Sequence, residues 1–517
     1  MIAVAMVVLS ACGLSNSDSG GDTADLTITV GTPALDGNWI DPMQARNALS
    51  TAWMRDAVGE GLARQEVDGS WVPGLATSWK LSDDRLTWTF SLRRDVKMHD
   101  GSIFTAQDVK TAIDRVVREA AKSPENWIDY LSHSGYAKAI DKVVVVDDLT
   151  VEVTTKQPYP NLLQDSPVPI ATDYYNKVGE KGFMQEPVAA GPFKFVSQEV
   201  NQSIVVERFD DFWDEERKPN FKTLVMKAVP DETTRISGLQ SGQLDVVQGL
   251  SANGAEQLEG SGDIRIVTSE SASLGFIQML DNRDDDPSPL KDLRVREALL
   301  MAVDRQAIAD TLYKGYAQVP ATPFLTTTAG YDDSIEPQPY DPDRAKQILA
   351  EEGVPDLKLD LNSYSSSPSI PNVMKFVEAI AGYWEKIGVT VDLTLDDNAT
   401  YVQKSYDKAY DGASVFSING SFASELTGYV PYFTTDGILT SHNDDRFDNL
   451  LDKALATMDE NEREEYGRQL NKLMLETLYV LPMVRFDNIM AIGPRVAEFR
   501  PKVATPIAEP FWYLKAK

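Results

Sequence analysis

Stretches in which apolar and polar residues alternate predict most of the strands in this chain. Alternation with a period of two is typical of a strand that buries one face. The stretches with this pattern are residues 26–30, 86–92, 149–153 and 193–195, and the short apolar runs 143–146 and 204–206 also predict strands. An acidic turn at Asp147 and Asp148 separates residues 143–146 from residues 149–153 and predicts a hairpin.

Helical periodicity is concentrated in the second half of the chain. Asp292 and Asp341 each precede an apolar stripe with helical spacing, and aspartate is a favoured N-cap. Pro342 suits the first turn of the second helix, and Gly353 suits its end. A third stripe covers residues 447–458. Because strands and helices alternate irregularly, we expect an α/β fold with mixed sheets and helices on both faces.

Length and charge narrow the possible classes of protein. A chain of 517 residues is too long for one core, so we expect two or three lobes. The formal net charge is -30, which argues against a nucleic-acid partner, because phosphates require clustered Lys and Arg. The same charge argues against membrane binding in which a cluster of basic residues contacts anionic lipids.

The N-terminus carries a lipoprotein signal. Residues 1–9 are apolar, and the small residues Ser10 and Ala11 precede Cys12. The apolar run is too short to span a bilayer and predicts a signal peptide over residues 1–11, with Cys12 as the lipidated residue. The Ser-, Gly- and Asp-rich residues that follow predict a flexible tether over residues 12–25.

We expect no catalytic residues, no cofactor and no His/Cys metal site. Cys12 is the only cysteine, and the three histidines lie far apart in the sequence. A carboxylate metal site stays open at this point. No Gly-x-Ser-x-Gly, His-Glu-x-x-His or P-loop motif occurs. His99 is interpreted as a hydrogen-bonded turn histidine, because no nucleophile or second base stands beside it. The many acidic residues leave one alternative open, a secreted, lipid-anchored hydrolase with paired carboxylates.

A collinear series of motifs resembles the extracellular solute-binding proteins of ABC transporters, family 5, which comprise dipeptide-, oligopeptide-, opine- and nickel-binding members. The most specific block begins with Gly-Ser-Trp-Val-Pro-Gly-Leu-Ala-Thr-Ser-Trp at residues 69–79 and continues through Leu-Arg-Arg-Asp-Val-Lys-Met-His-Asp-Gly at residues 92–101. Further matching blocks are residues 104–109, 187–193, 211–213, 239–245, 293–298, 302–305 and 481–482.

The resemblance implies a two-lobed periplasmic-binding-protein-like fold of the large type II kind, with an extra subdomain inserted in lobe I. The chain would cross between the lobes near residues 276–282 and 482–488. The implied divisions are lobe I (26–58, 191–277 and 489–517), the inserted subdomain (59–190) and lobe II (278–488).

The resemblance also implies a function and partners. A small molecule binds between the lobes, the hinge closes, and the closed protein delivers the solute to an ABC permease and its ATPase. The protein would be a monomer, held by its lipid on the outer face of the cytoplasmic membrane. A binding protein that signals or scaffolds without transport is a further alternative, which the sequence does not separate from the first.

Two loops are expected to face each other across the cleft. Aromatic, Asn and Ser side chains suit a largely apolar pocket with a few fixed polar groups. Peptide binders that the chain resembles carry in the second loop an aspartate that pairs with the peptide amino terminus, and residues 419–424 have no carboxylate. An oligosaccharide, an opine-like conjugate or a blocked peptide therefore competes with a free peptide as the ligand, and a nickel chelate is less favoured. The expected ligand residues are Asn38, Trp39, Asp41, Phe416, Ile418, Asn419, Ser421 and Phe422.

Overall fold

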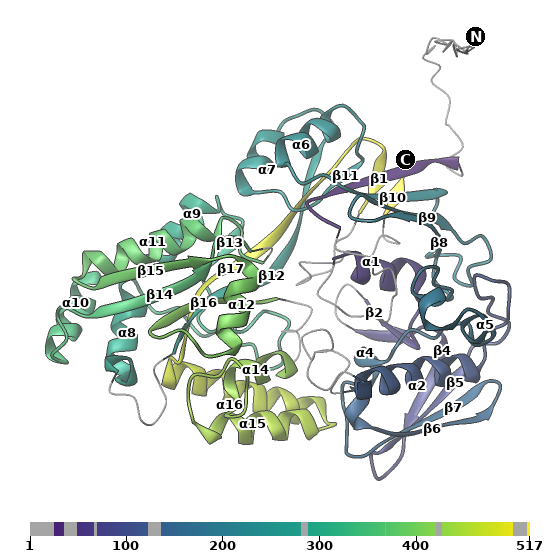
Figure 1. Cartoon of the computed structure of the whole chain (residues 1–517), viewed down its shortest axis with the longest axis horizontal. Helices are drawn as coiled ribbons and strands as arrows, with labels where there is room; N and C mark the ends of the chain where they lie inside the picture. The colour runs from purple at the N-terminus through teal and green to yellow at the C-terminus, as the bar shows by residue number, and fades with distance from the viewer. Residues whose placement is uncertain are drawn as a thin grey trace, which may run out of the picture.

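One large mixed sheet runs through the molecule and joins its two halves (Figure 1). The computed structural model describes residues 25–35, 49–66, 70–122, 136–280, 288–367, 369–419, 426–499 and 514–517. In spatial order the strands are β15 (Thr390–Asp396), β14 (Lys358–Tyr364), β16 (Ala413–Asn419), β12 (Arg265–Met279), β17 (Val480–Ile492), β11 (Val246–Val247), β1 (Thr27–Thr32), β10 (Thr223–Ala228), β9 (Ser203–Arg208) and β8 (Phe193–Glu199), with β13 (Ala317–Gln318) also paired to β17.

Two long antiparallel strands, β12 and β17, connect the halves. Their pairing begins at Arg265 opposite Ile492 and ends at Gln278 opposite Val480. The register breaks between Ser269 and Ser273 and shifts again between Gly275 and Phe276, and the first break separates an outer from an inner part of the ladder. β11 pairs with β17 beside one segment, and β16 pairs with β12 beside the other. These two strands therefore pass from one half of the molecule to the other.

The first half contains a second sheet and a continuous apolar core, here called the first core. A separate four-stranded sheet packs with the helices around it against β1 and β8 to β10, as the shared cluster of Ile28, Phe90, Ile113 and Phe193 shows. The remaining elements of this half are β2 (Ala63–Gln65), β3 (Trp71–Pro73), β4 (Ala76–Leu81), β5 (Thr87–Leu92), β6 (Ile140–Asp147), β7 (Thr150–Thr155), β18 (Val496–Glu498), β19 (Lys515–Ala516), α1 (Leu49–Val58), α2 (Ala106–Lys122), α4 (Leu162–Asp165), α5 (Thr172–Phe183), α6 (Glu232–Gln240) and α7 (Ala252–Leu258).

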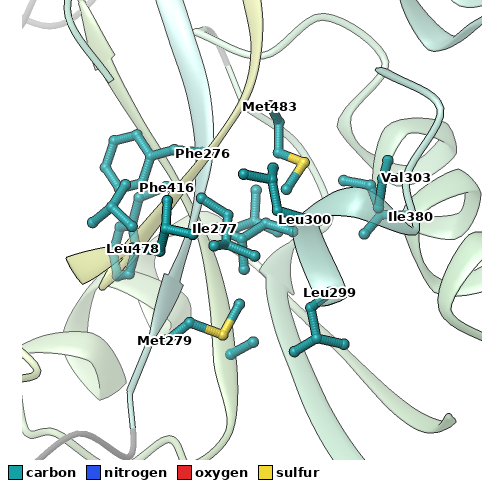
Figure 2. Packing of buried hydrophobic residues seen from close by; sticks show 14 of the residues in the cluster. Phe276, Ile277, Met279, Leu299, Leu300, Val303, Ile380, Phe416, Leu478 and Met483 are labelled. Carbon is teal, nitrogen blue, oxygen red and sulfur yellow. The ribbon is translucent and has the colours of Figure 1, made fainter. Parts of the chain in front are cut away.

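The second half is built around the larger of the apolar clusters, here called the larger core. Figure 2 shows Phe276 and Ile277 of β12 packed near Phe416 of β16 and Leu300. The helices of this half are η3 (Pro289–Lys291), α8 (Leu293–Met301), α9 (Arg305–Leu312), α10 (Pro342–Glu351), α11 (Val373–Lys386), α12 (Asn398–Tyr406), η4 (Leu426–Tyr429), α14 (Val430–Phe433), α15 (Asp445–Ala456) and α16 (Glu460–Thr477).

The strand and helix predictions can be checked against these elements. The predicted hairpin is confirmed as β6 and β7, which pair antiparallel. Both predicted caps are confirmed, because Asp292 accepts a hydrogen bond from the Arg294 amide and Asp341 accepts one from the Arg344 amide. Gly353 has a φ of 77° just after α10 ends, a conformation that glycine adopts without strain.

The third predicted helix, over residues 447–458, extends two residues beyond the end of the observed helix. α15 ends at Ala456, and Asp459 caps the next helix by accepting a hydrogen bond from the Glu462 amide. Met458 therefore lies in the turn between the two helices. It packs against the first core, so the α15–α16 turn of the second half touches the first half.

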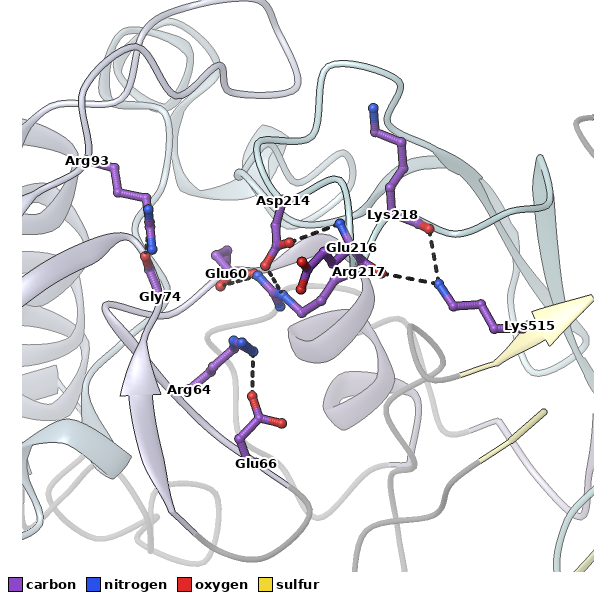
Figure 3. A network of polar contacts seen from close by, with 10 residues as sticks. All are labelled: Glu60, Arg64, Glu66, Gly74, Arg93, Asp214, Glu216, Arg217, Lys218 and Lys515. Atoms are coloured by element: carbon purple, nitrogen blue, oxygen red, sulfur yellow. Dashed lines mark hydrogen bonds and ion pairs between the residues drawn. The ribbon is translucent and has the colours of Figure 1, made fainter.

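An ion-pair network joins Glu60, two residues after α1, to the loop after β9 (Figure 3). Arg217 Nη2 donates to both carboxylate oxygens of Glu60 at 2.9 Å, and Arg217 Nε donates to Asp214 Oδ2 at 2.7 Å. Burial alone would lower the pKa of Arg217, but the charge of Glu60 and the hydrogen bond to Asp214 raise it. Arg93 lies 4.0 Å from the centre of the Trp213 ring and donates to the Gly74 carbonyl.

The helices within the described residues include none that is both long and apolar enough to cross a bilayer.

Candidate functional site

The carboxyl ends of parallel strands meet at one edge of the sheet in each half. β14 runs parallel to β15 and β16, and these strands end at Tyr364, Asp396 and Asn419. In the first half β1 lies between β10 and β11, is parallel to both, and ends at Thr32. Ligands of open α/β sheets bind outside such strand ends, where neighbouring connections diverge. These two edges are therefore the candidate solute site, and in Figure 1 α1, which follows β1, lies across the centre of the molecule from α12 and α14.

Aromatic side chains form a packed layer beneath the end of β16. Phe416 is buried, and its ring centre lies 6.2 Å from that of Phe276, 5.9 Å from that of Tyr432 and 5.6 Å from that of Tyr401. Ile418, two residues along and on the same face, is also buried. Both residues lie in the packed interior, and their contact with a solute stays a prediction.

The groups around this layer are mostly hydroxyls and carbonyls. The Tyr364 hydroxyl lies 3.5 Å from Ser417 Oγ, and the Tyr432 hydroxyl donates to the Ser417 carbonyl at 3.4 Å. Ser273 Oγ donates to the Ser369 carbonyl at 2.6 Å. Burial raises the pKa of both tyrosines, so they remain neutral. Around the aromatic layer this edge therefore offers neutral donors and acceptors, whereas the carboxylate of Asp396 at the end of β15 pairs with Lys404.

A small pocket opens near the start of β16. Its volume is about 160 Å³, and it lies between the end of α12, the first residues of β16 and the segment that precedes His442. Phe416 contributes one wall, so the aromatic layer separates this pocket from the strand ends. The other lining residues are Leu280, Ser405, Lys408, Tyr410, Asp411, Ser414, Ile438, Leu439, Thr440 and Ser441.

Several predicted residues lie outside the described part of the chain. Of Asn419 only the backbone is described, and it pairs with Ser273. The structure adds Tyr364 and Tyr432 to the side chains near the end of β16. Apolar and polar residues alternate only over residues 358–361 of β14, so no sequence pattern marked Tyr364, which the structure places at the end of that strand. The predicted residues outside the description are Asn38, Trp39, Asp41, Ser421, Phe422 and Cys12.

His99 has a structural position. Its Nε2 lies 2.9 Å from the Gly191 carbonyl, and its ring meets that of Phe209 edge-on at 4.9 Å. Desolvation lowers the pKa of His99 to about 4, so the imidazole is neutral near pH 7. The prediction of a hydrogen-bonded turn histidine is confirmed. The described residues contain no group of three or more His, Cys, Asp or Glu side chains placed to hold a metal ion.

Comparison with known proteins assigns the family. The model of the bacterial extracellular solute-binding proteins, family 5 (middle), matches residues 70–439. Heme-binding protein A of Haemophilus influenzae is 27% identical over 473 residues, which cover 85% of this chain and 82% of that protein. Glutathione-binding protein GsiB of Pectobacterium atrosepticum is 31% identical over 381 residues, which cover 72% of this chain and 69% of that protein.

A solved structure confirms the expected fold. The periplasmic binding protein DppA of Helicobacter pylori, in complex with the peptide STSA, superposes with a TM-score of 0.78 at 22% identity, covering 96% of this chain and 99% of that one. The α/β periplasmic-binding-protein fold expected from the sequence is thus confirmed. Members of the matched family bind solutes without transforming them, and the hydrolase alternative is set aside. This chain belongs to the bacterial extracellular solute-binding proteins of family 5 and is not an enzyme.

Proposed function

We propose that this protein captures a small solute outside the cytoplasmic membrane and delivers it to the permease and ATPase of an ABC importer. The observation that carries the proposal is the match of the family model over residues 70–439. The architecture supports it, because two halves with separate cores are joined by β12 and β17. A solute that contacts both halves stabilises the closed arrangement by its greater affinity for that form.

The division into lobes remains a proposal. We assign residues 26–58, 191–277 and 489–517 to lobe I, 59–190 to the inserted subdomain and 278–488 to lobe II, with one adjustment. Residues Leu274 to Met279 pack in the larger core, and the register of β12 breaks between Ser269 and Ser273. The first crossing is therefore better placed at residues 270–272 than at 277.

The solute in this proposal is peptide-like or sugar-like. The protein does not bind it through an ion pair between a carboxylate and a free amino terminus. Relatives are named for binding heme and glutathione, and a solved relative holds a peptide, so the family accepts varied solutes. A buried ammonium without an opposite charge is costly. Residues 419–424 contain no carboxylate, and Tyr364, Ser417 and Tyr432 supply neutral groups at the end of β16.

Calorimetric titration tests this ligand class. Matched free and N-acetylated di- to pentapeptides, together with a panel of oligosaccharides, are titrated into the purified protein. We expect acetylation to leave the affinity of any binding peptide within about threefold, since no ion pair to the amine is lost.

The residue assignments are tested with the solute that binds best. Asn419→Ala is expected to weaken its binding about tenfold or more, the effect of one buried hydrogen bond to a polar ligand. Asp356→Asn, an exposed change in the second half, serves as the control and should leave the affinity unchanged. Tight binding of free peptides that is lost on acetylation would contradict the proposal and show that an amine anchor exists.

We also propose that Cys12 becomes the lipidated N-terminal residue after removal of residues 1–11, and that residues 12–25 tether the folded protein to the membrane. The sequence Leu-Ser-Ala-Cys-Gly at residues 9–13 supports this proposal. Cys12→Ser is expected to abolish partitioning into a detergent phase, whereas Ser15→Ala in the tether should partition as the unmodified protein does. The proposal that Cys12 is lipidated fails if the Cys12→Ser variant stays membrane-anchored and no unprocessed form accumulates.

A further inference from the structure

Arg485 is a buried guanidinium that lacks a negatively charged partner. It lies on β17 with 6% of its surface exposed. Nη2 donates to Gln318 Oε1 at 2.6 Å, and Nη1 lies 3.3 Å from the Tyr331 hydroxyl. The charged carbon lies 5.5 Å from the centre of the Tyr331 ring. Among the described residues no hydrogen-bond acceptor reaches Nε, and no carboxylate forms an ion pair with any nitrogen of this side chain.

Three other buried arginines of the described structure are better satisfied. A fourth, Arg235, also lacks an acceptor at Nε, but its Nη atoms donate to three backbone carbonyls. Arg217 pairs with two carboxylates, Glu60 and Asp214. Arg296 donates to the backbone carbonyls of Leu290 and Thr477, and Arg305 donates to those of Pro320, Pro482 and Gln338. Arg485 has only a neutral side-chain amide and a phenol. A buried cation left in this state destabilises the fold, unless an anion compensates its charge.

The sheet register places Arg485 beside the candidate solute site. Directly opposed residues on neighbouring strands point to the same face, and one such row contains Gln318, Arg485, Leu274 and Ile418. Only the row of Phe486, Ser273 and Asn419 lies between it and the end of β16. Arg485 is therefore two strands, about 10 Å, from Ile418. It shares the face of the sheet that carries Phe416 and Ile418.

We propose that Arg485 is the anion anchor of the solute site and binds a carboxylate of the solute, an inference that rests on the proposed function. Nε and Nη2 form one edge of the guanidinium fork, and a carboxylate accepts two parallel hydrogen bonds from such an edge. Nε is free for this purpose among the described residues. Nη2 is held by the amide of Gln318, an exposed residue whose side chain can turn aside. The solute is thus a small carboxylic acid held by its acid end.

The test compares acids with their uncharged derivatives. N-acetylated di- and tripeptides with a free carboxylate are titrated beside their C-terminal amides, and glutathione is titrated beside its dimethyl ester. The unmodified protein is expected to bind at least one free acid tenfold or more tightly than its amide or ester. Arg485→Gln should reduce that preference to less than twofold, while Arg94→Gln, at an exposed arginine of the first half, should leave it intact.

Gln318→Glu provides a second test that does not depend on how well Arg485→Gln folds. A carboxylate at this position would lie where the amide oxygen now accepts from Arg485. We expect this variant to raise the melting temperature of the solute-free protein and to lose the preference for free acids, because its own carboxylate occupies the guanidinium.

The outcomes separate this inference from the proposed function. Equal binding of acid and amide by the unmodified protein overturns the anchor, as does an acid preference that survives in Arg485→Gln or Gln318→Glu. If a neutral sugar binds and closes the lobes, as measured by small-angle scattering, the proposal that Arg485 is an anion anchor is overturned. The proposed solute-binding function is then still supported. If no solute of either panel binds, the proposed function fails together with the anchor.

Discussion

Glu60→Ala is expected to lower the free energy of unfolding of the first half by about 3–5 kcal/mol, the usual effect of removing one partner of a buried ion pair. Glu60 is 5% exposed, and both of its carboxylate oxygens accept hydrogen bonds from Arg217 Nη2 at 2.9 Å. Alanine would leave the guanidinium of Arg217 with Asp214 as its remaining anionic partner. The lost energy is therefore mainly the cost of an inadequately paired buried charge.

Chemical denaturation followed by tryptophan fluorescence measures this effect. Glu66→Ala is a matched control, because Glu66 pairs with Arg64 at 2.8 Å while both side chains remain partly exposed. That pair should contribute less than about 1 kcal/mol. The double variant Glu60→Met with Arg217→Met should recover much of the loss, because it removes both charges together. A Glu60→Ala variant as stable as Glu66→Ala would show that the buried network contributes little.

Local sequence signals were sufficient for elements whose ends are fixed by neighbouring residues. Asp292 and Asp341 cap α8 and α10 as predicted, since a cap needs only a side-chain oxygen and the amides two or three residues later. The same logic explains the failure at Met458. Its spacing continued the apolar stripe, but Asp459 starts a new helix, and the methionine packs against the opposite half of the molecule. A stripe does not reveal which core its last member contacts.

The candidate site was harder to predict from the sequence, because segments far apart along the chain form it. Phe416 was predicted to contact the solute, yet its neighbours Phe276, Tyr401 and Tyr432 form a layer that only the sheet register brings together. No pattern in the sequence marks Arg485 as a site residue. Its importance rests on a missing carboxylate, and that can be seen only when Gln318 and Tyr331 are placed beside it. The overall fold came from the family resemblance rather than from periodicity.

Trp384→Ala is expected to lower the stability of the second half by about 3–5 kcal/mol, as large-to-small changes at fully buried aromatic residues do. Trp384 lies on α11 in the larger core with none of its surface exposed. Its indole nitrogen donates to the Leu299 carbonyl at 2.8 Å, so alanine would leave both a cavity and an unpaired buried acceptor. Trp384→Phe should cost less, because the ring still fills most of the space. Met374→Ala on the same helix is the control, since Met374 is 48% exposed and should change stability by less than about 0.5 kcal/mol.

Native-state hydrogen exchange measures the stability of each half separately. A single melting temperature would not do so in a protein with two cores. If the lobes are separate cooperative units, Trp384→Ala accelerates exchange in the amides around α8, α10 and α11 and leaves those around β5 and α2 unchanged. Glu60→Ala should show the reverse pattern. A solute that contacts both lobes, as proposed, should slow exchange in both variants, because binding stabilises the form that it selects. Equal acceleration in both halves by Trp384→Ala would mean that β12 and β17 couple the cores into one unit, and the proposed division into two hinged lobes would have to be abandoned.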